Sequence, residues 1–162
     1  MSQQEFKKIP IRSIQQKDNA LNVSFEIEKI KETENTEKMI VEAHRHDFYH
    51  IMFIKEGVGE NIVDFKTYEV RPNMLFFISP GQVHSIKLSA DVKGYVISFN
   101  SDFYLLSDNI QKLLDFPFFH SINNTPLIHL SEGNTKIQTV FDELYEEYLK
   151  PYRNKKRNSL KI

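Results

Sequence analysis

The stretch HRHDFYHIMFIKEGVGENIVDFKTYEVRPNMLFFISPGQVH, residues 44–84, decides the fold of this chain. Within it, short apolar segments alternate with turn residues: FYHIMFI at 48–54 precedes a Gly-Val-Gly turn, and LFFI at 75–78 precedes a Pro-Gly turn. Aromatic and β-branched residues favour strands, whereas Gly, Pro and Asn favour turns. Short strands at this spacing predict an all-β sandwich or barrel rather than alternating strands and helices.

Further strands are expected on both sides of this stretch. Apolar and polar residues alternate over 23–28, which is the two-residue period of a half-buried strand. The polar run 31–38 predicts a loop, and 62–70 predicts a hairpin folded back at 64–67. The remaining expected strands are 86–88, 95–99 and 127–130.

The last part of the chain has the pattern of an amphipathic helix. We expect Ser131 to cap a helix that reaches Lys150 and is ended by Pro151. Its apolar positions follow one another at steps of 3, 1, 3, 1 and 3 residues, so they form one stripe. The stripe can pack on its own barrel, pair with a second copy of the helix, or do both. Its members are Ile137, Val140, Phe141, Leu144, Tyr145 and Tyr148.

The composition of the 162 residues excludes several classes of protein and site. The chain has no cysteine, so it has no disulfide and no cysteine nucleophile, and any metal must be held by histidines and carboxylates. A formal net charge of -1 excludes a globally basic surface for nucleic acid. The apolar runs are too short for a membrane-spanning helix and no secretory signal is visible, so we expect a cytoplasmic protein without a membrane partner.

Four of the six histidines lie in two short motifs. His44, His46 and His50 share one parity in the run HRHDFYH, and His84 closes the run SPGQVH. Residues two apart on a strand point to the same face, and antiparallel pairing would place His84 opposite the first group. Imidazoles that converge inside a rigid barrel can hold a divalent metal or bond to a ligand, and without any partner their burial is costly.

This order of motifs resembles the two motifs of the cupin superfamily. The first cupin motif runs His-x-His, then an acidic residue and a Gly, and here His50 stands at the acidic position after His44 and His46. The second motif, Pro-Gly followed by His, is matched by PGQVH at 80–84. The resemblance implies a mainly β, cupin (double-stranded β-helix or jelly-roll) barrel followed by C-terminal α-helices. It also implies that four histidines bind the ligand: His44, His46, His50 and His84. If a divalent metal is the cofactor, the same four residues form the metal site.

Within the cupins, residues 20–160 look like the sensing domain of AraC-family transcriptional regulators. His-x-His-x-Phe-Tyr, an apolar strand, Gly-x-Gly and Pro-Gly-x-x-His recur in that family in this order. The helix around FDELYEEYLK, residues 141–150, is similar to the family's dimerisation helix. We therefore expect residues 1–130 to form a cupin-type barrel with an N-terminal arm. Residues 131–162 would supply the dimerisation helix and the start of a linker towards a helix-turn-helix DNA-binding domain that these 162 residues do not contain.

The resemblance implies a binding module rather than an enzyme, with no catalytic residue. Its partners would be a small-molecule effector, a sugar or another metabolite, and a second copy of the chain bound through the helix stripe. DNA would be contacted only through the absent domain. Two other functions stay open at this point: a mononuclear metal-dependent cupin enzyme (a dioxygenase or isomerase) that uses the same four histidines, and a stand-alone sugar-binding cupin.

Overall fold

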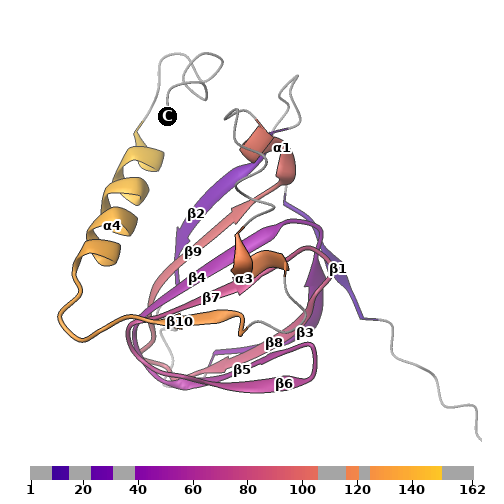
Figure 1. Ribbon diagram of the computed structural model, residues 1–162, viewed down its shortest axis with the longest axis horizontal. Helices are drawn as coiled ribbons and strands as arrows, with labels where there is room; N and C mark the ends of the chain where they lie inside the picture. The colour runs from indigo at the N-terminus through magenta and orange to yellow at the C-terminus, as the bar shows by residue number, and fades with distance from the viewer. Residues whose placement is uncertain (1–8, 15–22, 31–38, 106–115, 121–124, 151–162) are drawn as a thin grey trace, which may run out of the picture.

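The fold is two facing β-sheets with a C-terminal helix against one of them (Figure 1). The computed structural model describes residues 9–14, 23–30, 39–105, 116–120 and 125–150. The loop predicted at 31–38 and the linker predicted beyond Lys150 lie outside these residues. Within the described part, no helix is both long and apolar enough to cross a membrane.

Each sheet has five strands. Sheet A has the order β1 (Ile11–Arg12), β3 (Met39–His46), β8 (Val83–Leu88), β5 (Gly59–Val63) and β6 (Lys66–Val70). Sheet B has the order β10 (Leu127–His129), β7 (Met74–Ile78), β4 (Tyr49–Glu56), β9 (Lys93–Phe99) and β2 (Phe25–Lys29). The described helices are α1 (Ser101–Leu105), α3 (Pro117–His120) and α4 (Lys136–Leu149).

The chain crosses repeatedly from one sheet to the other, which makes the fold a jelly-roll of the cupin type. β3 lies in sheet A, β4 in sheet B, the β5–β6 hairpin in sheet A, β7 in sheet B, β8 in sheet A and β9 in sheet B. Strand pairs are antiparallel except for β1, which adds to the edge of β3 in parallel. The cupin barrel and the C-terminal helix predicted from the sequence are therefore confirmed. The short strand β1 was not predicted.

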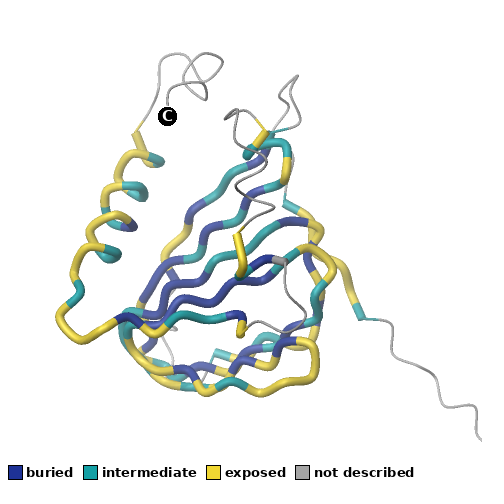
Figure 2. The backbone as a smooth tube through the Cα atoms, in the orientation of Figure 1, coloured by how far each residue is buried: buried dark blue, intermediate teal, exposed yellow. Residues whose placement is uncertain are grey.

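Two apolar cores hold the sheets and helices together. Figure 2 shows that the buried residues lie mainly along the strands. Alternate residues of β4 serve the two cores: Met52 and Ile54 face the space between the sheets, whereas Phe53 faces outward beneath α4. All five residues of β7, Met74–Ile78, are buried because both of its faces are covered. This explains why β7 reads as a continuous apolar run rather than as an alternating one.

The predicted hairpin and the predicted helix start have different outcomes. The chain turns back at Asp64 and Phe65, whose φ angles of 45° and 68° are those of a two-residue hairpin turn. The prediction that Ser131 caps α4 is wrong. Its carbonyl instead accepts a hydrogen bond from Asn134 in a turn where Gly133 adopts a φ of 78°, and the helix begins only at Lys136.

The apolar stripe of α4 packs on sheet B of its own chain. Phe141 is 6% exposed, and its ring stacks on Phe53 and Tyr95 at centroid distances of 5.1 Å and 5.7 Å. Val140 is 56% exposed. The four other members of the stripe are partly buried against the same core: Ile137, Leu144, Tyr145 and Tyr148. The role of the stripe in dimerisation stays a prediction.

Replacing Phe141 by Ala should destabilise the domain strongly. We expect Phe141→Ala to lower the free energy of unfolding by about 3 kcal/mol, because it removes a buried ring from the contact between α4 and the barrel. Glu143→Ala, at an exposed position of the same helix, is the control and should change that free energy by less than about 0.5 kcal/mol. Urea denaturation followed by circular dichroism measures both. Equal losses for the two variants would contradict the packing described here.

Candidate functional site

The pairing of β3 with β8 brings the histidines of the two motifs together. His44 lies directly opposite His84, and His46 follows on the same face of β3. A register shift between Val41 and His44 changes the parity of β3, so that both Val41 and His44 can face the interior. After a bend at residues 47–48, His50 enters from β4 in the opposite sheet.

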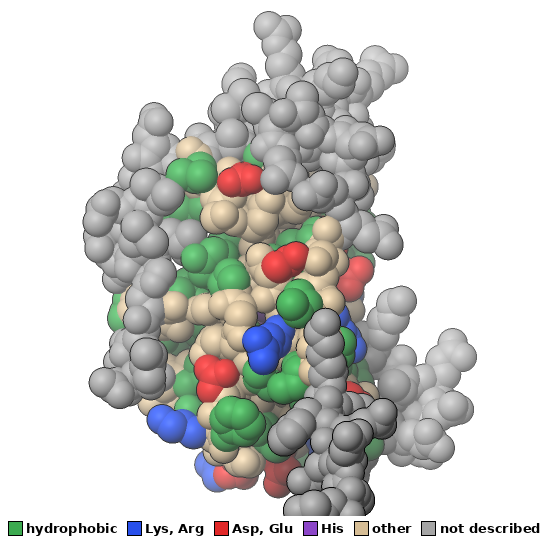
Figure 3. All heavy atoms as spheres, turned by 90° about the vertical axis from the view of Figure 1, so that its right-hand side faces the viewer, with side chains coloured by type: hydrophobic (Ala, Val, Ile, Leu, Met, Phe, Trp, Pro, Cys, Tyr) green, Lys and Arg blue, Asp and Glu red, His purple; other side chains and the backbone are tan. Residues whose placement is uncertain are grey.

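Three of these imidazoles meet at their Nε2 atoms. Nε2 of His46 lies 3.1 Å from Nε2 of His44 and 2.7 Å from Nε2 of His84. All three side chains are buried: His44 is 2% exposed, His46 5% and His84 3%. Almost no histidine surface is visible on the face of the molecule in Figure 3. The three form a group whose ligand atoms all lie within 4.8 Å of one another.

His50 stands beside this group rather than within it. Its ring stacks on that of His46 at a centroid distance of 4.8 Å and an interplanar angle of 9°. Its Nδ1 lies 3.3 Å from the hydroxyl oxygen of Ser98 on β9. The structure thus places all four predicted residues in one cluster, in which His50 is half-buried and the other three are buried. Those three form a metal-type ligand set.

Burial keeps the imidazoles neutral. Burial, reinforced by the neighbouring His44 and by Arg12, lowers the pKa of His46 to about 4. The same causes, with the other histidines of the cluster, lower the pKa of His50 to about 3 and that of His84 to about 2. A neutral imidazole has one N–H and one lone pair, so each ring can offer one nitrogen as a ligand.

The tautomer of His44 is fixed by the backbone. Its Nδ1 lies 2.7 Å from the carbonyl oxygen of Glu42, and because a carbonyl only accepts, Nδ1 must carry the proton. Burial lowers the pKa of His44, so the ring is neutral and its Nε2 presents a lone pair to the cluster. Metal-binding histidines are commonly oriented by a bond of this kind at the other nitrogen.

The cluster contains buried polar atoms without a protein partner. Among the described residues, nothing accepts from or donates to Nδ1 of His46 or Nδ1 of His84. An unpaired buried polar group costs about 1–3 kcal/mol, so these atoms are expected to bond to something that is not part of the protein. Asn61 on β5 is fully buried in the same interior, and its side-chain oxygen and nitrogen are also unpaired.

The donor set fits a divalent metal. Imidazole nitrogens about 2.0–2.1 Å from a zinc-like ion stand about 3 Å apart when they are neighbours, close to the Nε2 separations of His46. His44, His46 and His84 would hold the ion, and His50 is close enough to contact whatever occupies the remaining positions. A bound ion would act as a Lewis acid or as an anchor for the oxygen atoms of a ligand.

Sequence reasoning missed three residues that shape the site. Arg12 comes from the N-terminal arm, where β1 pairs with β3 beside His46, and its charge contributes to the lowered pKa of all four histidines. Ser98 and Asn61 lie on strands outside the two motifs. The spacing of residues along the chain gives no signal for any of them, because each reaches the site only through sheet pairing.

The fold and the buried histidine cluster define a cupin-type binding barrel. The chain belongs to the family of AraC-like ligand-binding domains, whose model matches residues 30–162. This confirms the sequence prediction of a ligand-sensing domain of the AraC type. No curated protein matches the chain significantly.

Solved structures that match part of this chain include ToxT, a cupin protein and an oxalate decarboxylase. ToxT from Vibrio cholerae O395, solved with (E)-4-(8-methylnaphthalen-1-yl)but-3-enoic acid, is 14% identical with a TM-score of 0.47, over 79% of this chain and 49% of ToxT. A cupin protein from Bacteroides fragilis is 18% identical with a TM-score of 0.34, over 48% of this chain and 63% of that protein. An oxalate decarboxylase from Bacillus subtilis is 12% identical with a TM-score of 0.34, over 57% and 30% of the two chains. The chain spans less than two thirds of each of these three proteins.

The lowered pKa values make the stability of the domain depend on pH. Below pH 6.5 the unfolded chain binds protons at histidines that stay neutral in the folded state, so the free energy of unfolding falls as the pH falls towards 4. Between pH 7 and pH 5, the free energy of unfolding should fall by about 2 kcal/mol less in His84→Gln than in the wild type, because one histidine that takes up a proton only on unfolding has been removed. Urea denaturation in the presence of EDTA measures it. The exposed His129→Gln is the control and should leave the wild-type pH dependence unchanged.

Proposed function

We propose that this domain takes its small-molecule effector inside the barrel, at the four-histidine cluster. The observation that carries the proposal is the meeting of three buried, neutral imidazoles whose Nδ1 and Nε2 atoms are not all satisfied by the protein. Neutral imidazoles and the amide of Asn61 both donate and accept hydrogen bonds, which suits hydroxyl groups such as those of a sugar. In an intact regulator, occupancy would act on DNA binding only if the effector binds two arrangements of the protein with different free energy.

A metal-dependent enzyme is the second candidate. It is favoured by one observation, the lone pair that Nε2 of His44 presents to the group formed with His46 and His84. A resident ion is compatible with both functions, since it can anchor an effector as well as polarise a substrate. The distinction therefore rests on whether an occupied site turns a molecule over.

Metal analysis of the purified protein separates these cases. Protein purified without added metal or chelator is analysed by mass spectrometry for bound metal and for any co-purifying small molecule. If the cluster is the binding site, His46→Ala should lower retention of either by at least about tenfold, because it removes the nitrogen shared by both short contacts. His129→Ala, outside the cluster, should retain what the wild type retains.

The outcomes have separate meanings. A small molecule that is lost in His46→Ala and is recovered chemically unchanged supports the sensing role. Stoichiometric metal with oxygen-dependent conversion of the co-purifying molecule would favour the enzyme. Retention that is identical in wild type and His46→Ala would contradict both, because neither function could then use the cluster.

We also propose that the domain forms a homodimer through α4. The exposed side chain of Val140 and the partly buried Ile137, Leu144 and Tyr148 give the helix an apolar surface beyond its contact with the barrel. Phe141 is already buried within its own chain, so its share in dimerisation would be to hold the helix in place. A two-fold axis would bring the same surface of each copy together.

A charge on the exposed part of the stripe should weaken the dimer. We expect Val140→Glu to raise the dissociation constant of the homodimer by about tenfold or more, since a carboxylate would be buried in an apolar contact. Thr139→Glu adds the same charge one position earlier, away from the stripe, and should have little effect. Sedimentation velocity over a concentration series measures both variants. A wild-type protein that stays monomeric throughout would refute the homodimer.

A further inference from the structure

A cavity lies outside the barrel, in a groove between α4 and the outer face of sheet B. Its volume is about 400 Å³, within the range of small-molecule sites. The side chains around it come from β2, β4, β9 and α4, elements that are far apart in the sequence. The residues that matter for its chemistry are Lys29, Lys55, Lys93, Tyr95 and Asp142.

Three lysines converge on this groove from three neighbouring strands. The strands β4, β9 and β2 are neighbours in sheet B. Each carries one lysine at the same end of the sheet: Lys55 on β4, Lys93 on β9 and Lys29 on β2. Like charges repel, so three ammonium groups around one cavity are unfavourable unless anions accompany them. Glu56 already accompanies Lys93, so Lys29 and Lys55 are the two ammonium groups that a bound anion would complement.

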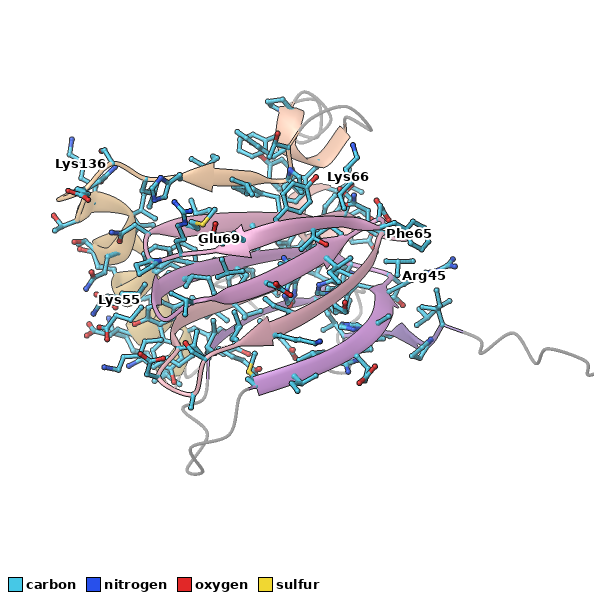
Figure 4. All side chains as sticks on the ribbon, turned by 90° about the horizontal axis from the view of Figure 1, so that it is seen from below. Arg45, Lys55, Phe65, Lys66, Glu69 and Lys136 are labelled. Atoms are coloured by element: carbon cyan, nitrogen blue, oxygen red, sulfur yellow. The ribbon has the colours of Figure 1, made fainter. Side chains whose placement is uncertain are left out.

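Local geometry directs two of these lysines into the groove. Lys55 occupies a register shift, where Ile54 pairs with Gly94 and Glu56 pairs with Lys93, and such bulges re-aim side chains. Figure 4 shows Lys55 at the side of the molecule where α4 lies. Nζ of Lys29 lies 4.9 Å from the ring centroid of Tyr145 on α4, so an aromatic face holds this ammonium beside the helix.

The acidic groups of the groove are partly engaged. Glu56 pairs with Lys93 at 2.9 Å, and Asp142 accepts a hydrogen bond from the hydroxyl of Tyr95. Burial and the nearby carboxylate raise the pKa of Tyr95, so its hydroxyl keeps its proton. Within the described part of the chain, no carboxylate pairs with Lys29 or Lys55. Two ammonium groups are thus available for a ligand.

We propose that this groove binds a small organic anion that also carries hydroxyl groups, of the chemical class of sugar acids and sugar phosphates. Lys29 and Lys55 would bind the oxyanion through charge-assisted hydrogen bonds. Asp142, at the edge of the same cavity, would accept from a hydroxyl of the ligand and would repel a second anionic group. The floor is apolar, formed by Ile30 and the ring of Tyr95, which suits the carbon face of such a molecule.

This site is distinct from the histidine cluster. His50 and Lys55 lie near opposite ends of β4, five residues apart, which is about 16 Å along an extended strand. The proposal does not depend on the function proposed for the cluster. Because α4 supplies one wall, occupancy of the groove would stabilise the helix on its own barrel and so affect the surface that it offers to a second copy.

The test is an NMR titration of the full chain with D-gluconate, D-glucose 6-phosphate, inorganic phosphate and neutral D-glucose. We expect the two hydroxylated anions to shift the backbone amides of Gly94, Tyr95 and Asp142, and D-glucose to leave them unchanged. The double variant Lys29→Gln with Lys55→Gln should weaken binding of both anions by at least about tenfold. Lys87→Gln, which removes an exposed lysine from sheet A, is the matched control and should bind like the wild type.

Three results would overturn the proposal. The first is the absence of shifts at the groove with either hydroxylated anion. The second is an affinity that is the same in the double lysine variant as in the wild type. The third is binding that is lost in His84→Gln but kept in the double variant, because the anion would then occupy the barrel. Inorganic phosphate that binds as tightly as glucose 6-phosphate would refute the part assigned to the hydroxyl groups and to Asp142.

Discussion

The hydrogen-bonded pairing of β3 with β8 is the constraint on which the interior of this domain depends. It sets His44 opposite His84. It thereby determines which side chains of the two motifs point inward. The register shift in β3 is part of this constraint, because it turns His44 and His46 to the interior and leaves the carbonyl of Glu42 facing Nδ1 of His44. A single irregularity in one ladder thus controls the direction of two imidazoles and the protonation of one nitrogen.

Much of this arrangement could be predicted from the sequence, for identifiable reasons. The aromatic and β-branched residues along 48–54 and the turn residues that follow each apolar run are local signals, so most strands and the β5–β6 hairpin could be predicted. The convergence of His44 and His84 was predicted from parity and antiparallel pairing. Arg12, Ser98 and Asn61 could not be predicted, since non-local strand pairing places them. Arg12 stays exposed on the edge strand and acts on the histidines only through its charge. The start of α4 was predicted too early because the turn at Gly133 uses the same polar residues as a helix cap.

The barrel carries two different chemistries at the two ends of β4. Near His50 the side chains are neutral imidazoles, whereas near Lys55 lysines gather beside a helix. The first environment suits uncharged polar groups or a metal ion, and the second suits an anion. Strands of a closely packed sheet deform little, so a change at one end reaches the other mainly through packing of α4 and the apolar cores rather than through bending of the strand.

The contact between α4 and sheet B consists largely of aromatic and aliphatic side chains, with the bond between Tyr95 and Asp142 as a polar addition. Release of the helix would expose mostly apolar surface and would therefore raise the heat capacity. Apolar association weakens on cooling, so the helix should be held less firmly in the cold than at moderate temperature. Cooling the domain should therefore loosen the contact between its C-terminal helix and the barrel.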